Sequence, residues 1–140
     1  MSNRILIDTN IVIDLLAKRL EFYEEAATLF SMSDKRELQL IISSLTFANT
    51  NYILSRQKTS KEAREILRKF KVLVEIANLD DKIIELALSD GNFHDFEDGL
   101  QYYSALENKV EIILTRNKKD FKHSKIPILT AKEYLAMNTP

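Results

Sequence analysis

The stretch "RILIDTNIVIDLL", residues 4–16, decides how this chain is expected to fold. Its opening "RILI" is a short apolar run rich in β-branched residues, which predicts a buried strand. The residues from Ile11 onward predict a helix. Asp8 stands between the two, directly after the predicted strand. The stretch therefore indicates a strand-to-helix unit with a carboxylate at the carboxyl end of its strand.

The same alternation of strand and helix continues along the chain. Apolar runs predict strands, and stripes of apolar residues at helical spacing predict helices. The expected strands cover residues 4–7, 38–43, 72–77, 110–115 and 126–130, and the expected helices cover 11–19, 20–35, 44–56, 59–70, 79–90, 95–106 and 131–137. Two glycines and two prolines are too few for a turn-rich all-β fold. We predict one α/β domain over residues 1–140, with a mostly parallel central sheet flanked by helices.

Composition excludes several kinds of site. The chain has no cysteine, so it forms neither disulfides nor thiolate metal centres. No segment has the length and apolarity of a membrane span, and no leader is recognised, so we expect a cytoplasmic protein with no membrane partner. The net charge is −1, so any contact with nucleic acid must come from local basic stretches. Two such stretches, 56–71 and 116–125, are equally explained as solvated surfaces.

Acidic residues cluster where predicted strands end and predicted helices begin. Asp8 follows the first strand, Asp95 and Asp98 open the helix of residues 95–106, and Asp120 follows the strand of residues 110–115. Each of them is explained singly as a helix cap or a turn residue. In a parallel sheet, however, these strand ends can meet at one edge, where gathered carboxylates repel one another unless a cation lies between them. Ligands that are all oxygen favour Mg²⁺ or Mn²⁺.

Four motifs, taken in order, resemble those of PIN domains. They read "ILIDTNIVIDLL", "IISSLTFANTNYIL", "DFEDGLQYYSALENKV" and "EIILTRNKKDF", and together they cover most of the chain. The resemblance is to the small, single-domain PIN ribonucleases that serve as VapC-like toxins of bacterial toxin–antitoxin pairs. It implies a metal-dependent endoribonuclease that hydrolyses RNA with Mg²⁺ or Mn²⁺ as cofactor.

The resemblance also implies roles for individual residues. Asp8 and Asp98 match the first and third acidic positions of the family and are expected to bind the metal, with help from Asp95. Asn117 or Asp120 would complete an outer or second-metal position. Supporting positions are Asn10, Asn49 and Thr115, and the basic side chains expected to steer the RNA backbone are Arg116, Lys118 and Lys119.

The second motif departs from the family at Asn49. Members usually carry Glu where this chain has "TFAN", and an amide offers an oxygen without a charge. Asp95 is the expected compensation. The departure leaves open an alternative function, a catalytically degenerate PIN-like module that binds RNA or protein. A phosphotransfer domain with Asp8 as nucleophile is disfavoured, because "DTN" lacks the second acid of that chemistry.

Partners are implied only by the resemblance. It predicts a small antitoxin protein that packs over the acidic site, and a homodimer. The aromatic residues Phe22, Tyr23, Tyr52, Tyr102 and Tyr103 either line such surfaces or pack in the core. His94 lies beside the acids as a proton carrier or as an incidental loop residue, within a predicted loop over residues 89–95.

Overall fold

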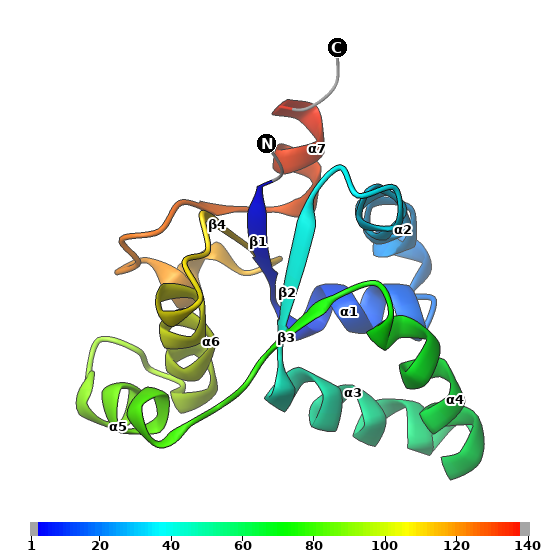
Figure 1. Ribbon diagram of the computed structural model, residues 1–140, viewed down its shortest axis with the longest axis horizontal. Helices are drawn as coiled ribbons and strands as arrows, with labels where there is room; N and C mark the ends of the chain where they lie inside the picture. The colour runs from blue at the N-terminus through cyan, green and yellow to red at the C-terminus, as the bar shows by residue number, and fades with distance from the viewer. Residues whose placement is uncertain (1–2, 138–140) are drawn as a thin grey trace.

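A computed structural model describes residues 3–137 of the chain (Figure 1). It confirms the predicted strand-to-helix opening, because β1 (Arg4–Ile7) leads through Asp8 into α1 (Thr9–Leu16). The remaining strands are β2 (Gln39–Ser43), β3 (Glu75–Ala77), β4 (Ile112–Leu114) and β5 (Ile128–Leu129). The remaining helices are α2 (Leu20–Asp34), α3 (Ser44–Gln57), α4 (Ser60–Lys71), α5 (Asp81–Ser89), α6 (Phe96–Glu107) and α7 (Ala131–Met137), together with a 3₁₀ turn, η1 (Lys118–Phe121).

The strands form one sheet in the order β3-β2-β1-β4-β5, and every pairing in it is parallel. The predicted parallel α/β sheet is therefore confirmed. The chain builds outward from β1 through β2 to β3 and then returns to the other side of β1 to form β4. The direction of winding reverses between β1 and β4, and side chains that follow these two strands face a shared crevice.

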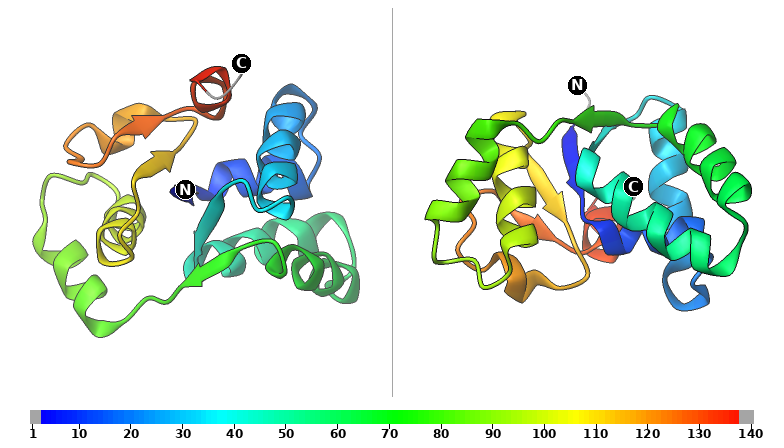
Figure 2. Two further views of the ribbon diagram at one scale, coloured as in Figure 1. Left: turned by 45° about the horizontal axis from the view of Figure 1, so that its top comes forward. Right: turned by 90° about the horizontal axis from the view of Figure 1, so that it is seen from below.

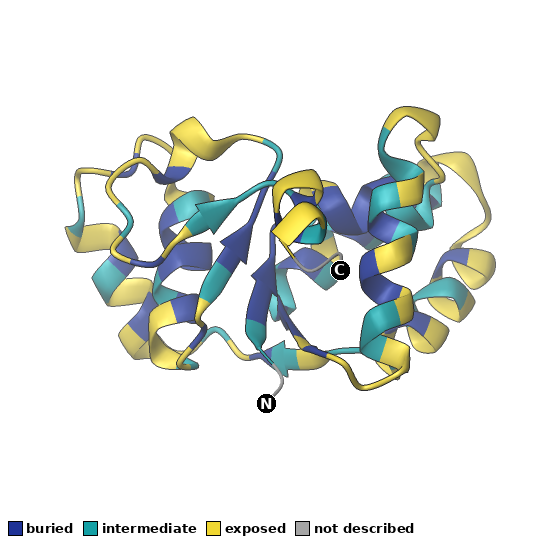
Figure 3. Cartoon of the chain, turned by 90° about the horizontal axis from the view of Figure 1, so that it is seen from above, coloured by how far each residue is buried: buried dark blue, intermediate teal, exposed yellow. Residues whose placement is uncertain are grey.

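Both faces of the sheet are covered by helices, as the two views in Figure 2 show. Alternate residues of a strand point to opposite faces. Ile5 and Ile7 join the larger core, with residues of α1, α2, α4 and α7, whereas Leu6 packs on the other side against residues of α6. α5 packs outside α6. Most residues of β1, β2 and β4 are buried, whereas the edge strands β3 and β5 are partly exposed, as are the outer faces of the helices (Figure 3).

Polar side chains start most of the helices. The caps are Asp8 for α1, Ser43 for α3, Thr59 for α4, Asp80 for α5 and Asp95 for α6. At α4, Thr59 and Glu62 form the reciprocal pair of hydrogen bonds of a capping box. Each cap fixes the residue at which its helix begins, and two of these caps are acids predicted to serve a site.

The structure differs from the sequence predictions mainly at element ends. β3, β4 and β5 are shorter than predicted, because pairing with a neighbouring strand is limited to residues 75–77 in β3, 112–114 in β4 and 128–129 in β5. The η1 turn was not predicted. Within residues 3–137, no helix has both the length and the apolarity that a membrane crossing requires.

Candidate active site

A cavity of about 200 Å³ opens at the carboxyl edge of the sheet, at the reversal between β1 and β4. It is lined by residues that come from the starts of α1 and α6, from α3 and from η1. These residues are Asp8, Thr9, Asn10, Leu45, Asn49, Asp95, Glu97, Asp98, Gln101 and Asp120. The four acids that the sequence placed at strand ends are thus brought together, with Glu97 as a fifth carboxylate.

Asp8 is the most firmly held of these acids. The Thr9 N–H donates to its Oδ1 at 2.9 Å, and the Thr115 hydroxyl donates to its Oδ2 at 2.8 Å. Burial raises the pKa of Asp8, and the two hydrogen bonds oppose that rise. Thr115 also accepts the Asn117 N–H at 3.1 Å, so one hydroxyl ties the end of β4 to the end of β1. The carboxylate is fixed in place before any ligand arrives.

Asp98 experiences the combined charge of the site. Burial raises its pKa, and the nearby carboxylates raise it further, in the order Asp120, Asp8, Asp95 and Glu97, to about 7. No side-chain hydrogen bond to Asp98 is found within residues 3–137, in contrast to Asp8. A half-buried carboxylate among like charges has its lone pairs free, and it gains from a cation.

A buried polar network supports the floor of the cavity. Gln101 Nε2 donates to the hydroxyls of Thr46 and Thr9, at 3.1 and 3.3 Å, and the two hydroxyls lie 2.9 Å apart. These contacts join α6, α3 and α1 behind the acids. Gln101 and Thr46 were missed in the sequence. The signal was present in their spacing, since Gln101 follows Asp98 by three residues and Thr46 precedes Asn49 by three.

Of the other predicted site residues, some line the cavity and others do not. Asn10 and Asn49 line it, whereas Thr115 is buried beneath Asp8. Asn117 is exposed at the start of η1, where its side chain makes no capping bond, and it does not line the cavity. His94 is exposed and does not line the cavity either. The structure thus places Asp120 closer to the other acids than Asn117.

The three basic residues predicted to contact RNA differ in their ion pairs and exposure. Arg116 Nε lies 3.0 Å from Oδ2 of the buried Asp14, and the Arg116 guanidinium stacks 4.1 Å from the ring centroid of Phe22. This engagement argues against the predicted RNA contact of Arg116, because moving that side chain would leave the buried Asp14 with only the more distant Arg19 at 3.8 Å. Lys118 pairs with Glu133 at 3.1 Å on the surface, and Lys119 is exposed.

The donor set fits a hydrated divalent cation. Among residues 3–137, no three His, Asp or Glu side chains are arranged to hold one ion directly. Mg²⁺, however, usually keeps several of its waters and binds through one or two carboxylates, and Asp8 and Asp98 both line this cavity of about 200 Å³. Burial first, and then the neighbouring carboxylates, raise the pKa of Asp98, so a cation in this cavity would favour its charged form.

Comparisons with known proteins identify the family of this chain. Ribonuclease VapC1 from Aquifex aeolicus (strain VF5) is 26% identical over 136 residues, which is 95% of this chain and 94% of that protein. A toxin–antitoxin complex from Klebsiella pneumoniae contains a chain that is 26% identical, with a TM-score of 0.67 and coverage of 90% of this chain and 96% of that one. DNA-bound VapBC from Salmonella typhimurium shares the fold at 16% identity, with a TM-score of 0.71 and coverage of 94% and 99%. The family model for the PIN domain matches residues 4–119, so the predicted resemblance is confirmed and the chain belongs to the PIN domain family.

Proposed function

We propose that this protein is a divalent-metal-dependent endoribonuclease and the toxin of a toxin–antitoxin pair. The observation that carries the proposal is the group of five carboxylates around one cavity, with the pKa of Asp98 raised to about 7. The ribonuclease name of one relative and the toxin–antitoxin description of another support the substrate and the biological setting.

In this proposal Asp8 and Asp98 hold the cation, Mg²⁺ or Mn²⁺. The bound ion supplies a water of lowered pKa and neutralises charge on the attacked phosphate. Thr115 keeps Asp8 oriented through the hydrogen bond to Oδ2. Asp95 and Asp120 face the same cavity, where they can bind the waters of the ion. Asn49 contributes an amide oxygen or nitrogen without adding charge.

The partners follow from the same proposal. A small antitoxin would silence the enzyme by packing over the acidic cavity, and two copies of the chain would form a homodimer. The similarity to a chain of the toxin–antitoxin complex from Klebsiella pneumoniae supports the first of these partners. Since the substrate would be cellular RNA, we place the protein in the cytoplasm.

Cleavage of a labelled RNA tests the catalytic part. We expect cleavage in Mg²⁺ or Mn²⁺, none in EDTA, and loss of at least about 100-fold in rate for Asp8→Asn and Asp98→Asn, because metal ligands and their partners carry effects of this size. Asp81→Asn is the matched control, since Asp81 is an exposed acid in the first turn of α5 and lies outside the cavity. Equal cleavage by all four proteins would refute the assignment.

A second function is favoured by one residue. Asn49 lines the cavity where the family usually has Glu, so the chain is alternatively a PIN-like module that binds RNA or protein without cleaving it. Calorimetry with Mn²⁺ separates the two functions, because a degenerate site shows no heat of binding that depends on Asp8. The Asn49→Glu variant sharpens the comparison: a module that lost its catalysis through this residue would gain cleavage, whereas an intact enzyme is already active.

A further inference from the structure

One face of α3 connects the acidic cavity to a second, basic hollow. Asn49, Tyr52, Ile53 and Arg56 are spaced by three and four residues, so they share one side of the helix. Asn49 lines the acidic cavity, while Ile53 and Arg56 line a hollow of about 360 Å³ together with Arg19 and Gln57. Tyr52 stands between these two sites. The helical rise puts it about 4.5 Å along the axis from Asn49, and Arg56 about 10 Å from Asn49.

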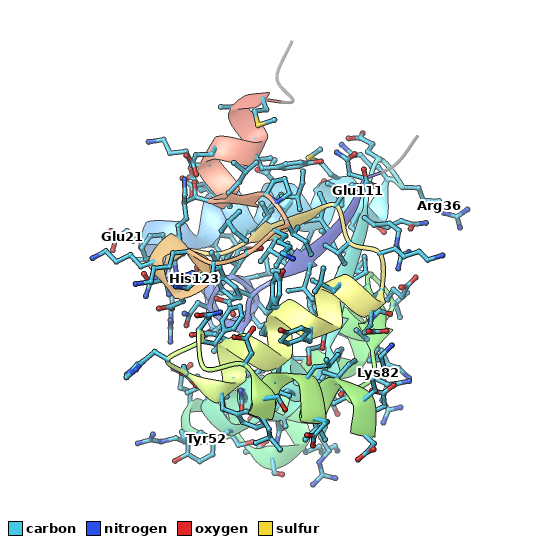
Figure 4. The ribbon with its side chains drawn as sticks, turned by 90° about the vertical axis from the view of Figure 1, so that its left-hand side faces the viewer. Glu21, Arg36, Tyr52, Lys82, Glu111 and His123 are labelled. Atoms are coloured by element: carbon cyan, nitrogen blue, oxygen red, sulfur yellow. The ribbon has the colours of Figure 1, made fainter. Side chains whose placement is uncertain are left out.

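Tyr52 is an unusual surface residue. It is 63% exposed, and Figure 4 shows it at the periphery of the molecule, on α3. The guanidinium carbon of Arg56 lies 5.6 Å from the centroid of its ring. An exposed aromatic residue is ordinary by itself. A flat aromatic face held beside a cation, one turn away from a carboxylate cavity, is the combination that proteins use for single-stranded nucleic acid.

The charges at this end of α3 are suited to phosphate. Within the described residues, Arg56 takes part in no ion pair, so its full charge faces solvent. Arg19 reaches the same hollow from the junction of α1 and α2, and its only ion pair with residues 3–137 is a long one, 3.8 Å, to the buried Asp14. The acidic cavity by itself repels a phosphate backbone. A polyanion that approaches this site is therefore held by the two arginines.

We propose that a single-stranded RNA runs along this face of α3, with one base stacked on Tyr52 and a neighbouring phosphate bound by Arg56 and Arg19. The inference rests on the proposed function, because it takes the phosphate that reacts to lie at the acidic cavity. The stack then fixes which phosphate of the strand reaches the acids. Because every base has a stacking face, this contact selects unpaired RNA and tolerates many sequences.

Binding is measured separately from cleavage. The probe is a fluorescein-labelled oligoadenylate of about 12 nucleotides, a length within the range of single-strand binding sites, and the readout is fluorescence anisotropy. All variants are made in a background protein that carries Asp8→Asn and Asp98→Asn. These two substitutions remove two negative charges and prevent cleavage. RNA is titrated in EDTA, so that no metal ion contributes to binding. Tyr52→Ala is compared with Tyr52→Phe, which keeps the stacking face. Leu88→Ala is the matched control, because Leu88 is 65% exposed and lies on α5, away from the proposed path.

We expect Tyr52→Ala to raise the dissociation constant about 5- to 150-fold, the usual effect of removing one stacking residue. Tyr52→Phe and Leu88→Ala should bind as the background does. Arg56→Gln should weaken binding and lower the magnitude of the salt slope by about 0.7, the value of one contact to single-stranded phosphate. Lys82→Gln, on α5, serves as its charge control.

Two results would overturn the inference: unchanged RNA affinity of Tyr52→Ala, or an equal loss in Leu88→Ala. In the first case an antitoxin or another protein is the better occupant of this surface. Failure of the proposed function looks different. If the parent protein never cleaves RNA with Mg²⁺ or Mn²⁺ while Tyr52→Ala still weakens binding, the RNA path stands and the protein is a binding module.

Discussion

Replacing Asp98 by Asn should stabilise the metal-free protein above neutral pH. The raised pKa of Asp98, about 7 against an ordinary 3.8, comes first from burial and then from Asp120, Asp8, Asp95 and Glu97. The folded state therefore binds a proton at Asp98 over a pH range in which the unfolded chain does not. By linkage, the free energy of unfolding falls as the pH rises from about 4 to about 7, and it levels off above that.

The size of the effect follows from the same pKa. At 1.36 kcal/mol per pKa unit, a rise from 3.8 to about 7 sets a ceiling of about 4 kcal/mol. Because the Asp98 side chain is only half-buried, solvent screening lowers the expected gain to about 1–2 kcal/mol. Asn has the same shape and no charge, and within residues 3–137 the Asp98 side chain has no hydrogen bond to lose. For a chain of this length we expect the melting temperature of Asp98→Asn to rise by about 3–6 °C at pH 8.

Thermal and urea unfolding in EDTA, at pH 5 and pH 8, measure this gain. It should be smaller at pH 5, where much of the wild-type carboxyl is already protonated, and absent from the Asp81→Asn control at both values. Mn²⁺ at about 100 times its dissociation constant should then stabilise the wild type by about 2.7 kcal/mol and the variant much less. A melting temperature of Asp98→Asn at or below that of the wild type, at pH 8 in EDTA, would refute the repulsion among these acids.

Two further predictions concern side chains that support the site. Thr115→Val removes the hydroxyl between Asp8 and the Asn117 N–H without changing shape, so calorimetry should find Mn²⁺ affinity lower by about 10- to 100-fold; unchanged affinity would mean that Thr115 does not orient Asp8. Arg116→Gln leaves the Asp14 carboxylate, which is 1% exposed, without its nearer cation, and urea unfolding should show a loss of about 3 kcal/mol. Adding Asp14→Asn should recover most of that loss, and a double variant as unstable as the single one would contradict the ion-pair explanation.

Much of the fold was predictable because local signals agreed with tertiary packing. "RILI" is buried on both faces of the sheet, so it reads as a continuous apolar run, and the helix that follows begins at the residue that Asp8 caps. The elements that the sequence described poorly are short or lie at an edge. β5 has two residues, and η1 is a turn whose existence depends on where the loop after β4 packs.

The acids of the candidate site were predictable from the sequence, but the residues that hold the surrounding structure in place were not. Asp8 and Asp98 follow a strand end and a helix start, positions that the sheet topology brings to one edge. Asp14 and Arg116 are different, because their pairing joins α1 to the turn after β4 across 102 positions, and nothing in the spacing of either residue signals it. Long-range ion pairs of this kind are set by packing.

Helix capping and metal binding are often treated as competing explanations for an acid at a helix start, and under the proposed function they are parts of one arrangement in this chain. Parallel strands all send their following helices away from the same sheet edge, so the N-terminal ends of those helices, and any acids that cap them, gather there. A cap uses one lone pair of one oxygen: Thr9 N–H takes Oδ1 of Asp8, and Glu97 N–H takes Oδ1 of Asp95. Each carboxylate has further lone pairs, and both residues line the cavity. Asp98, which caps nothing, adds the charge that makes the group unfavourable without a cation. In the proposed metal site, the caps would therefore position Asp8 and Asp95, and the uncapped Asp98 would add the charge that favours a bound cation.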